Sequence, residues 1–418
     1  MTTLIYNIGK LYGVELGSVE KPFRGDDMQA SYDVDNVFML IVDGRVKQIG
    51  PDKDHAAVAS RLAVDEEINA HGAIVLPAFC DSHTHLVWAG DRTGEFVDKI
   101  KGLSYEEIAA NGGGILNSAD RLNATSEDEL FEQALRRLRQ VAAMGTGAIE
   151  IKTGYGLTLE GELKMLRVIQ RLKEAMPEMV IRSNFLGAHA VGRAFEGRQS
   201  EYVDHLIADM LPAMAGKADF VDVFCDRGFF TPEETDRILK AAAPLGMRPK
   251  IHANELDCSG GVQVGVANGA LSVDHLERIG QEEIELLAQS DTVATMLPGA
   301  SFFLGMPYAP ARKAIEGGCA VALASDYNPG SSPSGSMPFV MSLGCIKMKL
   351  LPSQALNAVT INGACAMGVQ DEIGTLSAGH WASFVMYKPY VPSLDYICQN
   401  YTEPMIDRVF LKGKEITG

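Results

Sequence analysis

The chain has 418 residues, 46% hydrophobic and 22% charged, which is typical of a folded globular protein and excludes a disordered one. Its formal net charge of −17 would repel phosphate backbones, so we expect no nucleic-acid partner. The sequence has no apolar run of about eighteen residues and no signal-peptide pattern, which predicts no membrane span. Seven scattered cysteines without a CxxC pair favour a reducing compartment, and we predict a cytoplasmic location.

Both ends of the chain are rich in short β-prone runs. Residues 37–42 and 45–50 flank the pair Asp43-Gly44, which is a good hairpin signal. Residues 383–387 and 408–414 have a similar composition. Because chain termini usually lie close together, we predict one small β-sandwich module assembled from residues 1–72 plus 373–418.

Between residues 73 and 372, apolar runs alternate with amphipathic helical stretches, which is typical of parallel βαβ units. We expect strands that end near His83, Lys152, His189, Cys225, His252, His275, Pro298 and Asp326, and the first of them includes the apolar run of residues 74–80. Helices are predicted over residues 128–144, 160–175, 232–245 and 281–289. Eight strands with helical crossovers predict an α/β fold, a (β/α)8 TIM-type barrel over residues 73–372. The alternative is a doubly wound open sheet, but no Gly-x-Gly-x-x-Gly follows the first strand.

Polar side chains gather at the ends of these strands, where the active sites of barrels lie. His83 and His85 stand two residues apart, so both imidazoles face the same space. We assign His252 as the third imidazole ligand of a metal ion and Asp326 as an anionic fourth. Three imidazoles and one carboxylate suit zinc or iron better than magnesium. The sequence therefore predicts one zinc or iron ion per subunit.

Such a ligand set leaves room for a water molecule, which the metal acidifies. We predict that Glu255 takes a proton from this water and returns it to a leaving nitrogen, the alternative being a surface carboxylate. His275 is interpreted as a catalytic group that hydrogen-bonds the water and the oxyanion, or else as a further ligand. Either Glu255 or His275 can be the main proton shuttle. Lys152 is interpreted as structural, and the alternative is a carbamylated lysine that bridges two metals.

The remaining histidines lie outside these strand ends. We interpret them as surface or structural residues: His55, His71, His205 and His380. They enter none of the predictions for the site.

The set of His-x-His on the first strand, His on the fifth and sixth, and Asp on the eighth resembles the amidohydrolase superfamily. Longer strings resemble its imidazolonepropionase family over nearly the whole barrel. The strings are residues 81–87, 89–92, 104–109, 111–115, 150–157, 185–190, 297–300 and 325–330. The Gly-Gly-Gly-Ile, Lys-x-Gly-Tyr-Gly and Asp-x-Asn-Pro-Gly strings among them are the specific part.

This resemblance implies hydrolysis of a small anionic substrate, 4-imidazolone-5-propanoate, to N-formimidoyl-L-glutamate in histidine degradation. It also implies a homodimer, which is common in this superfamily. Arg92 offers a bidentate cation for the propionate, with a salt bridge at the barrel rim as the alternative. We predict Glu255 as a substrate contact from its place beside the metal. The resemblance implies the other contacts, which are Arg92, Tyr155, His189, Asn328, Gly330 and Ser331.

The sequence departs from the family pattern at a few positions. Asn254 stands where many members carry an acid, which leaves Glu255 as the only carboxylate beside His252. Thr153, Ser325 and Ser383 are milder exchanges. A deaminase of a nucleobase or related aromatic ring is the alternative function. A non-catalytic metal-binding relative or a scaffold for partner subunits is a further one, which the intact set of ligands disfavours.

Overall fold

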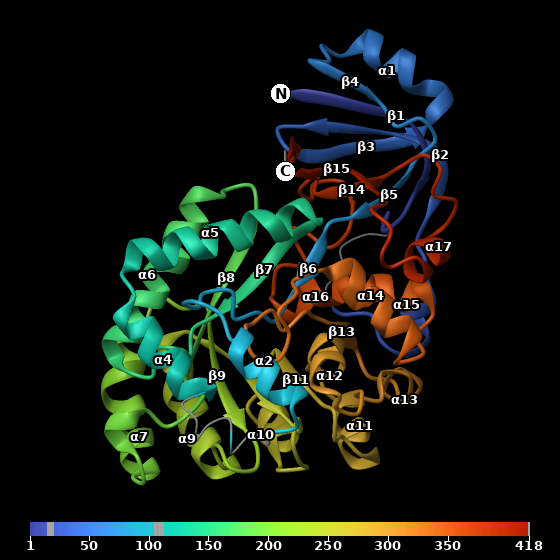
Figure 1. Ribbon diagram of the computed structural model, residues 1–418. Coiled ribbons are helices and arrows are strands. Elements are labelled where there is room, and N and C mark those ends of the chain that lie inside the picture. Colours follow the sequence, from blue (N-terminus) through green and yellow to red (C-terminus); the bar gives the residue numbers. More distant parts are fainter. Residues whose placement is uncertain (15–20, 104–106, 108–112, 417–418) are drawn as a thin grey trace.

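The computed structural model describes residues 1–14, 21–103, 107 and 113–416, and its strands form two eight-stranded sheets (Figure 1). Of the strings that resemble the family, residues 104–106 and 108–112 lie outside this description. No described helix is both long enough and apolar enough to cross a membrane.

One sheet, which we call the barrel sheet, consists of eight parallel strands in the order β13-β12-β11-β10-β9-β8-β7-β6. A parallel bridge between Thr84 and Tyr327 joins the two ends of this order, so the sheet closes. The predicted (β/α)8 barrel is confirmed. Its strands are β6 (Phe79–Asp81), β7 (Thr146–Lys152), β8 (Val180–Ala188), β9 (Phe220–Cys225), β10 (Arg248–Ala253), β11 (Ser272–His275), β12 (Val293–Met296) and β13 (Val321–Leu323).

Helices surround the barrel sheet on its outer side (Figure 1). Ser126, Thr158 and Thr231 each accept a hydrogen bond from a first-turn backbone N–H, and so start α5, α6 and α9 where the sequence predicts helices. The α-helices of the described chain are α1 (His55–Arg61), α2 (Thr93–Ile100), α4 (Gly114–Ala124), α5 (Glu127–Ala143), α6 (Leu159–Ala175), α7 (Gln199–His205), α8 (Leu211–Met214), α9 (Pro232–Ala242), α10 (Gly261–Ala267), α11 (Gln281–Ala288), α12 (Pro298–Leu304), α13 (Ala311–Glu316), α14 (Met337–Ile346), α15 (Pro352–Val359), α16 (Ile361–Ala366) and α17 (Leu394–Gln399).

The second sheet, the terminal sheet, combines strands from both ends of the chain in the order β16-β15-β14-β5-β1-β2-β3, with β4 beside β1. Its strands contribute to an apolar core that includes Ile8, Met39 and Phe384. The predicted hairpin is confirmed, because Asp43 and Gly44 both adopt the positive φ of a tight turn between β2 and β3. Its strands are β1 (Thr2–Leu11), β2 (Val34–Val42), β3 (Arg45–Pro51), β4 (Glu66–Asn69), β5 (Ile74–Pro77), β14 (Phe384–Tyr387), β15 (Ile406–Leu411) and β16 (Lys414–Glu415).

The chain passes from one sheet to the other between Ala78 and Phe79. The N–H of Ala78 donates to Ser383 in the terminal module, whereas the N–H of Phe79 donates to Gly145 at the start of the barrel. The prediction of one strand over residues 74–80 is therefore wrong, because that run divides into β5 and β6. The domain boundaries at residues 72/73 and 372/373 stay a proposal.

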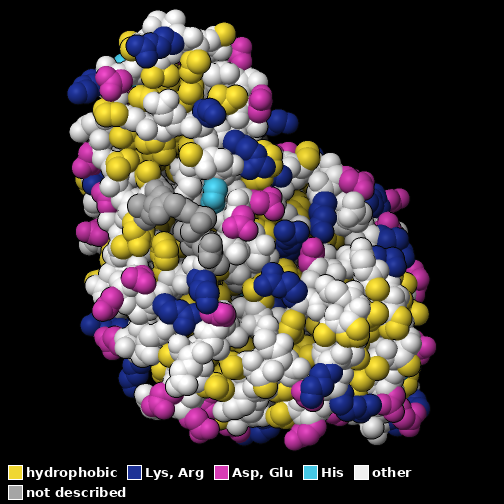
Figure 2. All heavy atoms as spheres, turned by 180° about the vertical axis from the view of Figure 1, so that it is seen from behind, with side chains coloured by type: hydrophobic (Ala, Val, Ile, Leu, Met, Phe, Trp, Pro, Cys, Tyr) yellow, Lys and Arg dark blue, Asp and Glu magenta, His cyan; other side chains and the backbone are white. Residues whose placement is uncertain are grey.

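One face of the molecule carries acidic and basic side chains in dispersed form. On the side turned away from the view of Figure 1, acidic and basic side chains are interspersed over both the narrow lobe and the broad one (Figure 2). The charges that bear on the site are instead inside the barrel.

Two lysines and three carboxylates are fully buried in the barrel interior. Lys152 Nζ lies 2.5 Å from a Glu150 oxygen and 2.7 Å from an Asp222 oxygen. Lys250 contacts the other oxygen of Glu150, and both ammonium groups lie 3.7 Å from Asp274. We call these five residues the buried charge network. Lys152 thus has the structural position that the sequence predicts.

Replacing Lys152 with Met should destabilise the protein by about 3–5 kcal/mol, because Glu150 and Asp222 would lose a buried counter-charge. The shift of the urea midpoint, followed by circular dichroism, measures this effect. Lys240→Met is the control, because Lys240 is 69% exposed in its pair with Asp236. We expect that change to cost about 0.5 kcal/mol or less. Equal midpoints for the two variants would contradict the prediction.

Candidate metal centre

The strand ends of the barrel bring the predicted metal ligands together. His83 and His85 follow β6, His252 lies in β10, and Asp326 follows β13. Asp326 Oδ1 lies 3.6 Å from Nε2 of His83 and 3.6 Å from Nε2 of His85. The rings of His83 and His252 are 4.5 Å apart. Two groups of potential ligand atoms, each within 4.8 Å of one another, share His83: one with His85 and Asp326, the other with His252 and His275.

The donor atoms in this cluster fit a metal ion. Nε2 of His83 and Nε2 of His252 are buried without a hydrogen-bond partner among the described residues, and His85 turns its Nε2 toward Asp326. Leaving such polar atoms unsatisfied is costly, and a cation would satisfy them. Burial lowers the pKa of His252 to about 4 and holds the pKa values of His83 and His85 well below the usual range. The imidazoles are therefore neutral, as metal ligands must be.

Two aspartates that sequence reasoning missed fix the orientation of two of these rings. Asp274 lies 2.6 Å from Nδ1 of His83, and Asp222 lies 3.0 Å from Nδ1 of His252. A carboxylate on Nδ1 takes the ring N–H and leaves Nε2 free to bind a metal. The signal in the sequence was a lone acid within an apolar strand, in Val221-Asp222-Val223 and Val273-Asp274.

His275 and Glu255 face each other at the edge of the cluster. Nε2 of His275 lies 3.6 Å from Glu255, and Nδ1 lies 3.5 Å from Glu277. Burial by itself would lower the pKa of His275, but the two glutamates raise it to about 10. Burial raises the pKa of Glu255 to about 7. This pair can therefore hold a proton between an imidazole and a carboxylate.

Backbone strain coincides with the site. His275 has φ of 83° and Asp326 has φ of 53°, which lie in the left-handed region that residues other than glycine rarely adopt. Asn254, between His252 and Glu255, has φ of 56°. Such conformations persist where the surrounding structure enforces them, and they gather at functional sites.

A cavity of about 750 Å³ opens above the cluster at the C-terminal ends of the strands. The side chains of His189 and His85 stack there, with ring centres 5.1 Å apart and planes at 19°. All predicted substrate contacts line this cavity together with Asp326, namely Arg92, Tyr155, His189, Glu255, Asn328, Gly330 and Ser331. The structure thus brings every one of these residues to one space.

Asn328 shapes the floor of this cavity. Its Oδ1 accepts hydrogen bonds from the N–H groups of Gly330 and Ser331, both at 2.8 Å. Its Nδ2 donates to the Asp326 carbonyl at 2.7 Å, and Ser331 Oγ donates to the Asp326 carboxylate at 2.9 Å. Asn328 therefore fixes the turn that positions Ser331 and Asp326.

Arg92 enters the cavity from the start of α2, where it is bonded to the carboxylate of Glu95. The two interpretations of Arg92, a cation for the substrate and a salt bridge at the rim, are compatible, because Arg92 forms an ion pair and also lines the cavity. Lys99, seven residues further, also lines the cavity and was missed by sequence reasoning. The available signal was the spacing of seven residues, which places Arg92 and Lys99 on one side of a helix.

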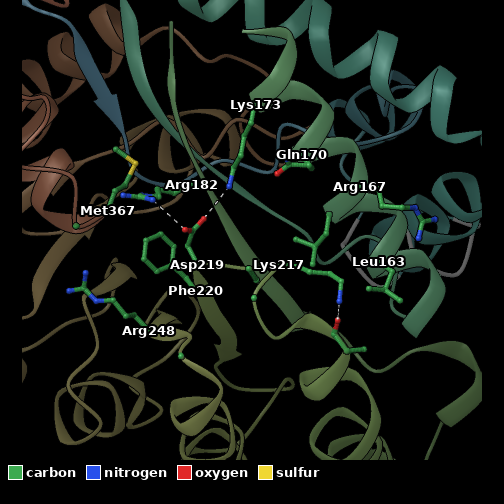
Figure 3. Close-up of a pocket in the computed structure, with 16 residues that line it drawn as sticks. Leu163, Arg167, Gln170, Lys173, Arg182, Lys217, Asp219, Phe220, Arg248 and Met367 are labelled. Atoms are coloured by element: carbon green, nitrogen blue, oxygen red, sulfur yellow. Dashed lines mark hydrogen bonds and ion pairs between the residues drawn. The ribbon is translucent and has the colours of Figure 1, made fainter. Parts of the chain in front are cut away.

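A second hollow, of about 870 Å³, lies at the opposite end of the barrel, near the start of β9 and β10. Asp219 lies there between Lys173 and Arg182, 3.4 Å from each (Figure 3). No histidine is among the described residues that line it. Because active sites of barrels lie at the C-terminal strand ends, we assign the site to the cavity above the histidines.

Comparison with known proteins places these features in a family. The model of the amidohydrolase family matches residues 74–416. An imidazolonepropionase from Flavobacterium johnsoniae is 47% identical over 418 residues, with 100% of both chains covered. One from Caldanaerobacter subterraneus is 40% identical, covering 99% of this chain and 97% of the relative.

Solved structures that resemble this chain share its fold at low sequence identity. A guanine deaminase from C. acetobutylicum with bound guanine has a TM-score of 0.69 at 14% identity, with 100% of both chains covered. The atrazine chlorohydrolase TrzN from Arthrobacter aurescens, complexed with zinc, has a TM-score of 0.68 at 14% identity, covering 99% of this chain and 94% of that one.

Replacing Asp222 with Asn should weaken binding of Zn²⁺ by about 10- to 100-fold, because the amide no longer fixes the His252 ring with Nε2 free. Competition with a chromogenic chelator measures this affinity. Asp204→Asn is the control, since Asp204 is 62% exposed in its pair with Arg237. An unchanged affinity in a folded Asp222→Asn protein would contradict the role of Asp222.

Proposed function

Because the chain belongs to the amidohydrolase family, and within it to the imidazolonepropionases, we propose that its barrel site opens the ring of 4-imidazolone-5-propanoate. The protein is a hydrolase of a carbon–nitrogen bond in a cyclic amide, and its product is N-formimidoyl-L-glutamate. The observation that carries this proposal at the level of the site is the convergence of unsatisfied imidazole nitrogens and Asp326 beneath a cavity with cations at its rim.

Members of the amidohydrolase family bind a metal. We propose one zinc or iron ion per subunit, held by His83, His85, His252 and Asp326. The buried, partnerless imidazole nitrogens and the zinc in the related chlorohydrolase support this proposal. Such an ion would lower the pKa of a water molecule, which would supply a nucleophile at neutral pH, and it would polarise the ring carbonyl.

The chain's own groups move the proton. We propose that the Glu255 carboxylate accepts a proton from the attacking water while the water oxygen bonds to the carbonyl carbon. Glu255 then gives that proton to the ring nitrogen as the carbon–nitrogen bond breaks, so no other acid is needed. His275 Nε2–H, 3.6 Å from Glu255, donates a hydrogen bond toward the oxygen that gains negative charge. Asp326, held by Ser331, keeps its orientation through the cycle.

The cavity residues orient the substrate. We propose that the planar ring lies near Tyr155 and His189, whose ring centres are 5.6 Å apart. The propionate then extends toward Arg92 at the rim, where Gly330 lies against the guanidinium and Asn328 and Ser331 border the substrate. The homodimer and the cytoplasmic location stay predictions that accompany this proposal.

The two alternative functions have weaker support. The likeness to a guanine deaminase at 14% identity shows the fold alone. A non-catalytic relative would be expected to lack part of the ligand set, whereas all of the predicted ligands converge here. No observation on the described residues favours either alternative over ring hydrolysis.

The purified protein loaded with Zn²⁺ or Fe²⁺ should consume 4-imidazolone-5-propanoate, measured as loss of the ultraviolet absorbance of the imidazolone. His83→Ala and Asp326→Ala should abolish turnover, since each removes a ligand, while His205→Ala on the outer helix α7 should leave it unchanged. Guanine and cytosine should not react. Release of ammonia from either base without imidazolone turnover would favour the deaminase.

Glu255→Gln should lower kcat by about 10²- to 10⁴-fold, because the amide cannot accept the proton of the water. The metal content, measured by elemental analysis, should stay at the wild-type level. An unchanged kcat would assign the proton transfer to His275 instead.

A further inference from the structure

The rim of the active cavity contains a second cation, Lys99, which forms no ion pair within 4.0 Å among the described residues. We infer that Lys99 is the residue that selects substrates with an anionic tail, and that its ammonium group pairs with the propionate of the substrate. This inference rests on the proposed function and adds to it a specificity-determining residue.

The charge of Arg92 is already balanced within the protein. Its guanidinium is bonded to the carboxylate of Glu95, and the two side chains are only 13% and 12% exposed. The other oxygen of Glu95 accepts a hydrogen bond from the N–H of Gly114 at 3.2 Å, which anchors this carboxylate to the start of α4. Arg92 can still donate hydrogen bonds to a ligand, but the pair that it forms with Glu95 has no net charge.

Lys99 lies two helical turns after Arg92 on α2 and faces the same cavity. Its Nζ donates a hydrogen bond to the carbonyl oxygen of Gly330 at 3.0 Å. In the described part of the chain, no carboxylate lies within 4.0 Å of this Nζ. An ammonium group has three donors, so two remain for a ligand.

The surroundings of Lys99 strengthen its interaction with an anion. The Nζ lies 5.6 Å from the centre of the Phe303 ring, which itself stacks on Phe96. These apolar groups exclude water from one side of the ammonium, and a charge pair gains strength where water is excluded. Burial and the nearby charge of Arg92 lower the pKa of Lys99 more than the carboxylate of Glu95 raises it, a cost that a bound carboxylate would relieve.

The opposite end of the cavity holds the proposed metal ligands and proton-transfer groups, which gives the substrate one productive orientation. Glu255, Glu277 and Asp326 are gathered around His275. The carbonyl that the water attacks must lie there, beside Glu255 and the proposed metal ligands, so the tail extends away from them. With the tail at Lys99, the ring points toward the histidine cluster. Because this contact is the same before and during ring opening, its loss should raise KM and leave kcat largely unchanged.

The test compares Lys99→Met with the wild type on two substrates, 4-imidazolone-5-propanoate and its neutral propionamide. For the propionate, kcat/KM should fall by about 10- to 100-fold in the variant, mainly through KM, the range expected for a lost hydrogen bond to a charged group. For the propionamide it should change by about 2-fold or less, and Lys99→Arg should retain most of the activity on the propionate. Lys101→Met is the matched control, since Lys101 follows the same helix and is 64% exposed.

Binding of imidazole-4-propanoate, which has no amide bond to hydrolyse, separates this inference from the proposed function. Calorimetry should show a loss of affinity of about 10- to 100-fold in Lys99→Met for the acid and none for imidazole-4-propionamide. An equal loss for the acid and the amide, or no loss for either, would overturn the role of Lys99. A wild-type protein that binds the acid selectively but opens no imidazolone ring would contradict the proposed reaction and leave the role of Lys99 standing.

Discussion

The hydrogen bonds between buried aspartates and the histidines of the proposed metal centre are the interactions on which this site depends. Asp274 is hydrogen-bonded to Nδ1 of His83, and Asp222 is hydrogen-bonded to Nδ1 of His252. Both carboxylates are also neighbours of Lys152. Each aspartate thus joins a ring of the site to the ion pairs in the centre of the barrel. A carboxylate without a counter-charge would be costly at this depth, so the lysines stabilise the aspartates and the aspartates orient the rings.

Closure of the barrel is the second condition for the site. The N–H of Asp326 donates to the carbonyl of His83, and the N–H of His85 donates to the carbonyl of Tyr327, both at 3.0 Å. These bonds bring the end of the first strand and the end of the eighth to one rim. The left-handed conformation of Asp326 at that point turns its carboxylate toward the histidines. Closure of the barrel therefore also brings Asp326 next to His83 and His85.

The local charge of the cavity differs from that of the whole protein. The chain carries a net charge of −17, and the carboxylates of Glu255, Glu277 and Asp326 lie around His275 at the inner end of the cavity. An anionic substrate is nevertheless accommodated if its charge stays at the rim, where α2 supplies Arg92 and Lys99. The ion pair with Glu95 makes Arg92 a rigid, oriented donor, while Lys99 retains its charge for the ligand. Positioning and charge compensation are thus divided between two residues of one helix.

The sequence alone determined the alternation of strands and helices, the hairpin at Asp43-Gly44, and the strand-end positions of His83, His85, His252 and Asp326. These features follow from local rules: side-chain periodicity, turn preferences and the tendency of barrels to place polar residues at one end of their strands. The division of residues 74–80 between two sheets was decided by tertiary structure, because only the pairing partners Ser383 and Gly145 distinguish β5 from β6. The partners of Asp222, Asp274 and Lys99 were likewise fixed only in the folded chain, since such contacts depend on the register of strands and loops that are distant in sequence.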